Sequence, residues 1–230
     1  MNRMIVALIA MMMVWGYTAQ SHAALFDRGS FTDSFGNQNH LIYDSDLNVT
    51  WYDYTNTYNT WQNQKDWATN KLAVNVNGNN ISGWRLPTTV DGLSVYGYDG
   101  TTTAGYNITS SGMGHLYYAE LGNNGGYDTS GKVPSSWGLK NTGPFHNLVA
   151  SGYWSGTAYA ADTANTGSAW YFYYSNGYQN ENKQTAGYLA LAVHDGDVAA
   201  PVPIPGTLGL LGSGLAGIFA WSRMFGRRRG

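Results

Sequence analysis

The sequence predicts an α+β fold in which two helices accompany a mostly antiparallel sheet, flanked by two terminal segments that lie outside the fold. The evidence is a β-rich stretch, two helical patterns and three later strand patterns, at 41–54, 60–74, 111–121, 153–157, 169–174 and 188–194. Because the strand patterns follow one another after the second helix, their order favours an α+β arrangement over alternating parallel units.

The first half of the predicted fold combines the β-rich stretch with the first helix. Residues 41–54 contain many β-branched and aromatic residues, and the Asp-Ser-Asp sequence at 44–46 is typical of a hairpin turn. Thr60 is a suitable N-cap for a helix that runs to about residue 74, since apolar residues recur there at helical spacing. A short strand is expected over 81–86.

The second half begins with a segment rich in Gly, Thr and Tyr at 90–111, which we expect to be a long ordered loop. A second helix is predicted over 111–121, with Gly122 as its C-terminal stop. Alternate residues share a face in the last two strands: Trp170, Phe172 and Tyr174 in one, and Leu189, Leu191 and Val193 in the other.

The N-terminal segment, residues 1–23, has the order of a secretory signal peptide. Arg3 supplies the positive start, 4–14 is an uninterrupted apolar run, and Ser21 and Ala23 put small residues before a cleavage site. The apolar run is too short to cross a bilayer, which requires about 20 residues. We therefore expect export, with removal of this segment by signal peptidase.

The C-terminal segment, residues 201–230, has three parts. A proline cluster at 201–205 is followed by an apolar stretch at 206–221, which we expect to be a transmembrane segment. Arginines beyond a membrane segment favour a cytoplasmic position for the end of the chain, so the region before it would lie outside. These arginines are Arg227, Arg228 and Arg229.

Pro203-Ile204-Pro205, the apolar stretch and the arginines together resemble the PEP-CTERM sorting signal of Gram-negative bacteria, although Ile204 stands where most members have Glu. The resemblance implies an exosortase-type sorting enzyme as partner. It also implies transient anchoring in the inner membrane, later removal of the tail, and a final place at the cell surface or in the extracellular matrix.

Charge and cysteine content restrict what the exported region can bind. Five of the 12 basic residues lie in the two terminal segments and all 14 acidic residues lie between them, which leaves a net charge of −7 on the region in between. A nucleic-acid partner is not expected for such a domain. Because the chain has no cysteine, disulfides and thiolate metal sites are excluded.

Residues 40–198 also carry short motifs similar to a bacterial extracellular domain found at the C-terminus of a collagen-like adhesin. The motifs are Asp46-x-x-x-Thr50-Trp51, Trp67-Ala68, Gly83-Trp84-Arg85-Leu86-Pro87-Thr88, Tyr153-Trp154-Ser155, Ala169-Trp170 and Ala192-Val193. This resemblance implies one domain over 24–200 with a C-type-lectin-like fold, of the kind shared with formylglycine-generating enzymes. It implies binding more than catalysis, and the oxidase chemistry of the enzymes is excluded because it requires cysteines.

Five residues of these motifs are expected to be structural: Trp84, Arg85, Pro87, Trp154 and Trp170. Among them Arg85 is one of only seven cations in the exported region. We expect it to be a buried or half-buried arginine that ties the helix to the sheet through a carboxylate or carbonyl groups.

The sequence offers only weak candidates for metal-binding residues. Asp44-x-Asp46-x-Asn48 has the first ligand spacing of a calcium loop but lacks the later glycine and glutamate. The calcium candidates are Asp44, Asp46, Asp195 and Asp197, and we favour the alternative that they are solvated turn carboxylates. The histidines show no zinc pattern, so no metal or other cofactor is predicted.

No catalytic residue is predicted. The chain has no Gly-x-Ser-x-Gly motif, and although Glu120 could pair with an aspartate as in glycosidases, nothing in the sequence selects that pair. A secreted polysaccharide hydrolase is therefore only a minor alternative.

The main functional hypothesis, binding of neutral sugars, rests on the tyrosines of the exported region. Exposed Tyr beside Asn and Gly suits neutral sugar rings, since it offers a face for stacking while amides bind hydroxyls. The candidate glycan-binding residues are Tyr96, Tyr98, Tyr106, Tyr127, Tyr171, Tyr173 and Tyr178. We expect an exopolysaccharide-binding or adhesion module, and a structural matrix subunit with no specific ligand remains the alternative.

Overall fold

The computed structural model describes residues 25–163 and 166–200, and within them 11 strands form one continuous sheet. This agrees with the expected α+β class. The strands are β1 (Leu25–Asp33), β2 (Gln38–Asp44), β3 (Val49–Asn59), β4 (Val74–Val76), β5 (Asn79–Ile81), β6 (Tyr96–Gly97), β7 (Ala104–Gly105), β8 (Gly152–Tyr159), β9 (Ser168–Tyr173), β10 (Tyr178–Lys183) and β11 (Tyr188–Asp195).

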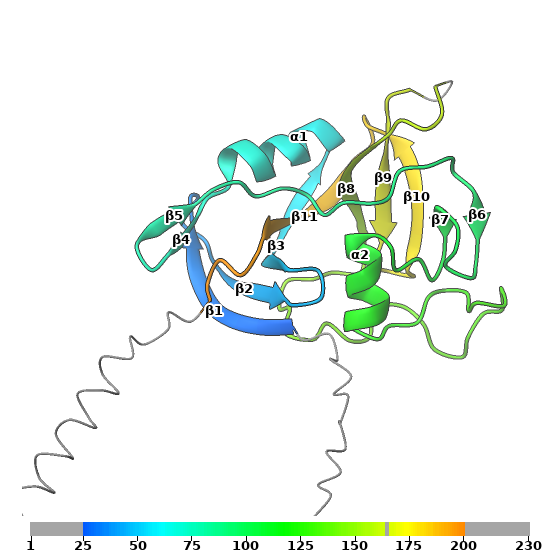
Figure 1. Cartoon of the computed structure of the whole chain (residues 1–230), viewed down its shortest axis with the longest axis horizontal. Coiled ribbons are helices and arrows are strands. Elements are labelled where there is room, and N and C mark those ends of the chain that lie inside the picture. Colours follow the sequence, from blue (N-terminus) through cyan, green and yellow to red (C-terminus); the bar gives the residue numbers. More distant parts are fainter. Residues whose placement is uncertain (1–24, 164–165, 201–230) are drawn as a thin grey trace, which may run out of the picture.

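The sheet consists of two halves joined by β11, in the order β5-β4-β1-β2-β3-β11-β8-β9-β10-β7-β6 (Figure 1). β11 pairs antiparallel with β3 on one side and parallel with β8 on the other. A second parallel pair joins the short strands β6 and β7, and the other neighbours are antiparallel. The last strand of the fold thus holds its first and second halves together.

Two helices pack on opposite faces of this sheet. The first is α1 (Trp61–Asp66), continued by a π-helical segment, η1 (Trp67–Lys71), and the second is α2 (Gly112–Gly114), continued by another, η2 (His115–Glu120). Alternation along β11 separates the two apolar cores: Ala190 and Ala192 face the core that contains α1, whereas Leu191 and Val193 face the core that contains η2. A strand buried on both faces explains why 188–194 reads as a continuous apolar run.

The helix predictions are largely confirmed. Ser111 caps the second helix, since its Oγ accepts the backbone N–H of Gly114 at 3.1 Å, and Gly122 ends it with a φ of 61°. The first helix begins after Thr60 as expected, but it ends at Lys71, because Val74 already begins β4. Thr60 makes no side-chain capping bond.

The strand predictions are less complete. The strand expected over 81–86 is wrong: β5 ends at Ile81, and Arg85 forms only an isolated bridge with Val193. β1 and β10 were not predicted from the sequence. β10 reads Tyr-Gln-Asn-Glu-Asn-Lys, which has weak strand preference, and it forms because its backbone pairs with β9 along its whole length.

The expected signal peptide at 1–23 and the expected transmembrane segment at 206–221 lie outside the described residues. Within the described ranges, no helix combines the length and the apolar character needed to cross a bilayer.

Asp33 closes the turn between β1 and β2 and has a depressed pKa. Burial alone would raise that pKa, but hydrogen bonds from the Tyr52 hydroxyl at 2.7 Å, the Asn37 amide and the backbone N–H groups of Phe35 and Asn37 outweigh burial and lower it. A carboxyl group with a lowered folded-state pKa stabilises the fold above its unfolded pKa of about 3.9 and loses that contribution as the pH falls through the folded-state value.

We therefore expect Asp33→Asn to lower the free energy of unfolding by about 1 to 3 kcal/mol at pH 7, because hydrogen bonds to a charged acceptor are lost. Urea unfolding at pH 7 and at about pH 2.5 measures this, and the difference from the unmodified chain should shrink at the lower pH. An equal difference at both pH values would contradict the assigned ionisation.

Candidate functional site

The seven predicted tyrosines form one connected group of rings, here called the tyrosine cluster, over β6, β7, β9, β10 and the loop after η2. Tyr106 lies at its centre, with ring centroids 5.1 Å from Tyr127 and 5.3 Å from Tyr178. Tyr98 stacks on Tyr106 at 6.2 Å with an interplanar angle of 8°. The remaining members join through Tyr96–Tyr98, Tyr96–Tyr178, Tyr171–Tyr178 and Tyr173–Tyr178 contacts.

Strand pairing explains why residues so far apart in sequence meet. Gln179 of β10 pairs with Gly105 of β7, and Gly105 pairs with Gly97 of β6. The tyrosines beside these positions are therefore carried on three adjacent strands. Nothing local in the sequence encodes this pairing.

Exposure differs within the cluster. Tyr106 and Tyr171 are each only 7% exposed, which corrects the expectation that all seven tyrosines are surface residues. Tyr96 is 50% exposed, and Tyr98, Tyr127, Tyr173 and Tyr178 are partly buried. Tyr106 and Tyr171 therefore support the cluster from inside the fold. A ligand could reach only the other five rings.

A polar cavity of about 240 Å³ lies beside the cluster, and Tyr127 belongs to both. The Asn107 side-chain amide donates to the carbonyl oxygens of Tyr98 at 2.6 Å and Tyr127 at 3.1 Å. These two bonds hold the cavity wall next to the tyrosine rings. Its lining residues are Asn107, Asn124, Gly125, Tyr127, Asp128, Thr129 and Pro134. Amide, carboxylate and phenol groups next to an aromatic wall are the combination that a neutral sugar requires.

The phenols of Tyr96 and Tyr173 stay protonated at neutral pH. Burial raises the pKa of Tyr96, and the neighbouring Tyr98 raises it further. Burial likewise raises the pKa of Tyr173, to about 12. These hydroxyls are therefore neutral groups that can both donate and accept hydrogen bonds.

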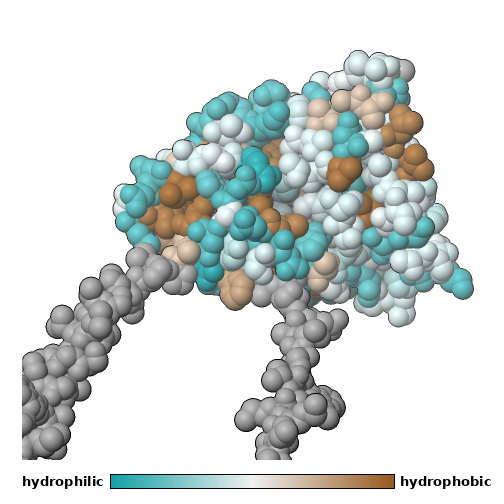
Figure 2. Space-filling model, viewed as in Figure 1, coloured by the Kyte–Doolittle hydropathy of each residue, from teal (hydrophilic) through white to brown (hydrophobic). Residues whose placement is uncertain are grey.

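An apolar strip borders the cluster on the segment that leads into β6. Val90, Leu93 and Val95 are exposed there, and Figure 2 shows brown patches over that part of the surface. The surface beside the tyrosines thus combines apolar and polar groups.

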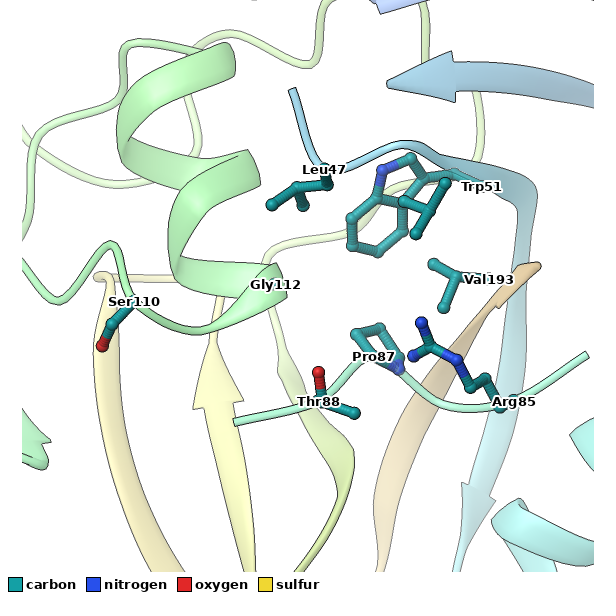
Figure 3. A pocket seen from close by; sticks show the side chains of 9 residues that line it. Leu47, Trp51, Arg85, Pro87, Thr88, Ser110, Gly112 and Val193 are labelled. Carbon is teal, nitrogen blue, oxygen red and sulfur yellow. The ribbon is translucent and has the colours of Figure 1, made fainter. Parts of the chain in front are cut away.

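Arg85 lies in a second, smaller pocket of about 150 Å³, with Trp51, Pro87 and Val193 among its walls (Figure 3). Its guanidinium donates to Asp195 at 2.6 Å and to the Leu86 carbonyl at 3.3 Å. Arg85 is half-buried and bonds a carboxylate and a carbonyl group, as expected. Neither partner belongs to a helix, so the expected connection between helix and sheet is not formed. Because the Asp195 side chain is 77% exposed, the ion pair contributes about 1 kcal/mol or less.

The other expected structural residues are buried. Trp84, Trp154 and Trp170 lie in the cores. The Pro87 carbonyl accepts the Ser155 hydroxyl at 3.0 Å and the backbone N–H of Gly156 at 2.8 Å, which attaches the segment after β5 to β8.

The four calcium candidates do not form one site. Asp195 pairs with Arg85, and Asp197 accepts two hydrogen bonds from Arg28, at 2.5 Å and 3.2 Å. Because each of these two carboxylates is paired with a guanidinium group, the geometry of Asp195 and Asp197 does not support the calcium hypothesis.

Asp44 and Asp46 instead lie beside two residues of η2. The structure brings together Asp44, Asp46, His115 and Glu120, here called the acid–imidazole cluster. His115 Nε2 lies 3.2 Å from Glu120 Oε1 and 4.0 Å from Asp46 Oδ2. Burial and the Asp44 charge raise the pKa of Glu120. Sequence reasoning missed this grouping because Asp44 and Glu120 belong to different halves of the chain.

Glu120 does approach aspartates, as a glycosidase pair would require. However, the side chain of Glu120 is 0% exposed and Asp44 is buried as well. A polysaccharide cannot reach carboxylates in that position, so this pair does not support glycosidase chemistry.

One family model matches the chain: the PEP-CTERM protein-sorting motif, over residues 201–229. The match supports an exported protein that an exosortase-type enzyme sorts after transient membrane anchoring. It covers the terminal segment alone, so the resemblance of residues 40–198 to the adhesin domain and its C-type-lectin-like fold is not supported by a family match. Among the curated proteins and the solved structures, none is significantly similar to this chain.

Proposed function

We propose that this exosortase-sorted chain is a non-catalytic glycan-binding or adhesion protein of the cell surface or extracellular matrix, and that the tyrosine cluster binds neutral sugar rings of an exopolysaccharide. The observation that carries the proposal is the convergence of seven tyrosine rings next to a cavity lined by amide and hydroxyl groups.

Tyr96 is the residue best placed to stack on a sugar. It is half exposed, and its ring is held by Tyr98 at 5.1 Å and Tyr178 at 6.1 Å, so little side-chain entropy is lost when a ligand binds. Tyr127 lines the cavity and contacts the same ring system. A sugar chain that spans both would combine stacking at Tyr96 with hydrogen bonds at the cavity.

The charge of the exported region favours a neutral ligand. A net charge of −7 between the two terminal segments repels anionic polysaccharides at long range. The proposal therefore takes uncharged hexose polymers as the ligand class.

The test is a titration of the full chain, purified in detergent, with neutral gluco-, manno- and galacto-oligosaccharides, and with alginate as the anionic comparison. We expect saturable binding to at least one neutral series and weaker binding to alginate. Tyr96→Ala and Tyr127→Ala should each weaken binding by about 3- to 10-fold, since an aromatic contact contributes about 0.5 to 1.5 kcal/mol.

Tyr58→Ala is the matched control, because Tyr58 is 62% exposed at the end of β3 and has no ring contact with the cluster. It should bind as the unmodified chain does. Equal losses of sugar affinity in all three variants would show that the sugar binds outside the tyrosine cluster. If no neutral series binds, the chain is better described as a structural matrix subunit, and release of shortened sugars would favour the hydrolase alternative.

A further inference from the structure

The acid–imidazole cluster takes no part in the proposed glycan site, and its geometry is that of a metal site. Asp44, His115 and Glu120 each offer one ligand atom, and these atoms all lie within 4.8 Å of one another. Ligands bound to one ion at about 2.1 Å lie at most about 4.2 Å apart. Rotamer adjustments of less than about 1 Å would therefore complete the contacts.

The π-helical form of η2 produces half of this arrangement. In an α-helix, residues five apart point to different sides, whereas π-type i to i+5 hydrogen bonding brings them to the same side. η2 shows this bonding, since the Leu121 N–H donates to the Leu116 carbonyl at 2.9 Å. His115 and Glu120 are separated by the same interval, and their side chains meet at 3.2 Å.

The other half comes from the turn after β2. The Asp44 carboxylate is oriented by the backbone N–H groups of Asp46 and Leu47, at 3.1 and 2.9 Å, and by the Trp51 indole at 3.2 Å. These donors fix the orientation of the Asp44 carboxylate beside η2 before any ion binds.

Two buried oxygen atoms at this place have no hydrogen-bond partner among the described residues. One is Glu120 Oε2, on a side chain with 0% exposure. The other is the hydroxyl of Tyr174, a fully buried residue in the same apolar core as Leu116 and Tyr117 of η2. Leaving a buried group such as Glu120 Oε2 unsatisfied costs about 1 to 3 kcal/mol in a folded protein, so this atom favours a bound species beside it.

We propose that Asp44, His115 and Glu120 bind one divalent transition-metal ion of the Zn²⁺ or Mn²⁺ type, with Asp46 within reach as a fourth ligand. One imidazole with two or three carboxylates suits these ions, whereas Ca²⁺ prefers oxygen ligands alone. The ion would join the β2–β3 turn to η2, and it would supply a cross-link in an exported chain that has no cysteine.

The experiment titrates the full chain, stripped with a chelator and purified in detergent, with Zn²⁺, Mn²⁺ and Ca²⁺ in separate calorimetric runs, and follows thermal unfolding in parallel. We expect one equivalent of Zn²⁺ or Mn²⁺ to bind and Ca²⁺ to bind at least about tenfold more weakly. At a hundredfold excess over Kd, the metal should raise Tm by about 5 to 10 °C.

Glu120→Gln and His115→Asn test the ligands. Both should weaken binding by at least about tenfold and abolish the rise in Tm. Glu181→Gln changes the other glutamate of the chain, lies in β10, and should bind as the unmodified protein does. If one ligand variant does not fold, loss of metal affinity in the other ligand variant, together with unchanged affinity in Glu181→Gln, still supports the site.

Three results would overturn the proposal: no saturable binding of Zn²⁺ or Mn²⁺, binding unchanged in both Glu120→Gln and His115→Asn, or preferential binding of Ca²⁺. None of them bears on the tyrosine cluster, because the two sites share no residue.

Discussion

Trp154→Ala is expected to lower the free energy of unfolding by about 3 to 5 kcal/mol, the range for removing a large aromatic side chain from a packed core. Trp154 is fully buried on β8, where its ring packs edge-on against Tyr188 at 4.7 Å and against Tyr171 at 6.4 Å. Its indole N–H donates to the Asn59 carbonyl at 3.1 Å. One side chain therefore connects four strands on both sides of the junction in the sheet.

The measurement is urea unfolding at pH 7, compared with Trp137→Ala. Trp137 is 45% exposed, and its removal should change stability by about 0.5 kcal/mol or less. Trp154→Phe should recover part of the loss, since it keeps the ring contacts but leaves the Asn59 carbonyl without its donor. A loss below about 1 kcal/mol in Trp154→Ala would show that the two halves of the sheet do not depend on this contact.

Gly105→Ala is expected to cost about 2 to 6 kcal/mol and to weaken the proposed glycan binding. Gly105 has a φ of 112°, which L-residues rarely adopt, and a Cβ atom there would overlap the carbonyl group of Gly97 on β6. Strain in the backbone and overpacking against a neighbouring backbone each contribute about 1 to 3 kcal/mol. Because Gly105 joins β6 to β10, the tyrosines on those strands should separate.

Gly36→Ala provides the control for backbone strain alone. Its φ of 85° is also unfavourable for alanine, but no atom lies within 4 Å of the added Cβ. We expect it to cost about 1 kcal/mol and to leave sugar binding unchanged. Urea unfolding measures the loss of stability in both variants, and the oligosaccharide titration measures their affinity for sugar. Equal losses in Gly105→Ala and Gly36→Ala would contradict the role assigned to the β6–β7 pair.

Several elements were predictable because their signals are local. The second helix has both of its ends written in the sequence: Ser111 caps its first turn, and Gly122 adopts the positive φ that ends it. The strand over 188–194 was predicted from alternating apolar residues, and Leu189, Leu191 and Val193 do share one core. Such patterns involve residues that are close together in the sequence, so they can be recognised without knowledge of the tertiary structure.

β10 and Arg85 illustrate the opposite case. β10 is polar and forms through pairing with β9, which its own composition does not indicate. The sequence predicts that Arg85 is buried or half-buried and ties a helix to the sheet. Arg85 is half-buried, but its carboxylate partner is the exposed Asp195 of β11 and not a residue of a helix. Which face of a short segment meets solvent depends on the elements that cover it, and those lie far away in sequence.

The sorting signal at 201–229, the absence of cysteine chemistry and the α+β class all follow from the amino-acid sequence, because each depends on composition or on short-range order. The folded chain alone shows that the tyrosines form one cluster and that Asp44 lies beside His115 and Glu120. These distances are set by strand pairing and by a π-helical turn. The former acts between distant segments, and the latter departs from the 3.6-residue period by which a sequence is read.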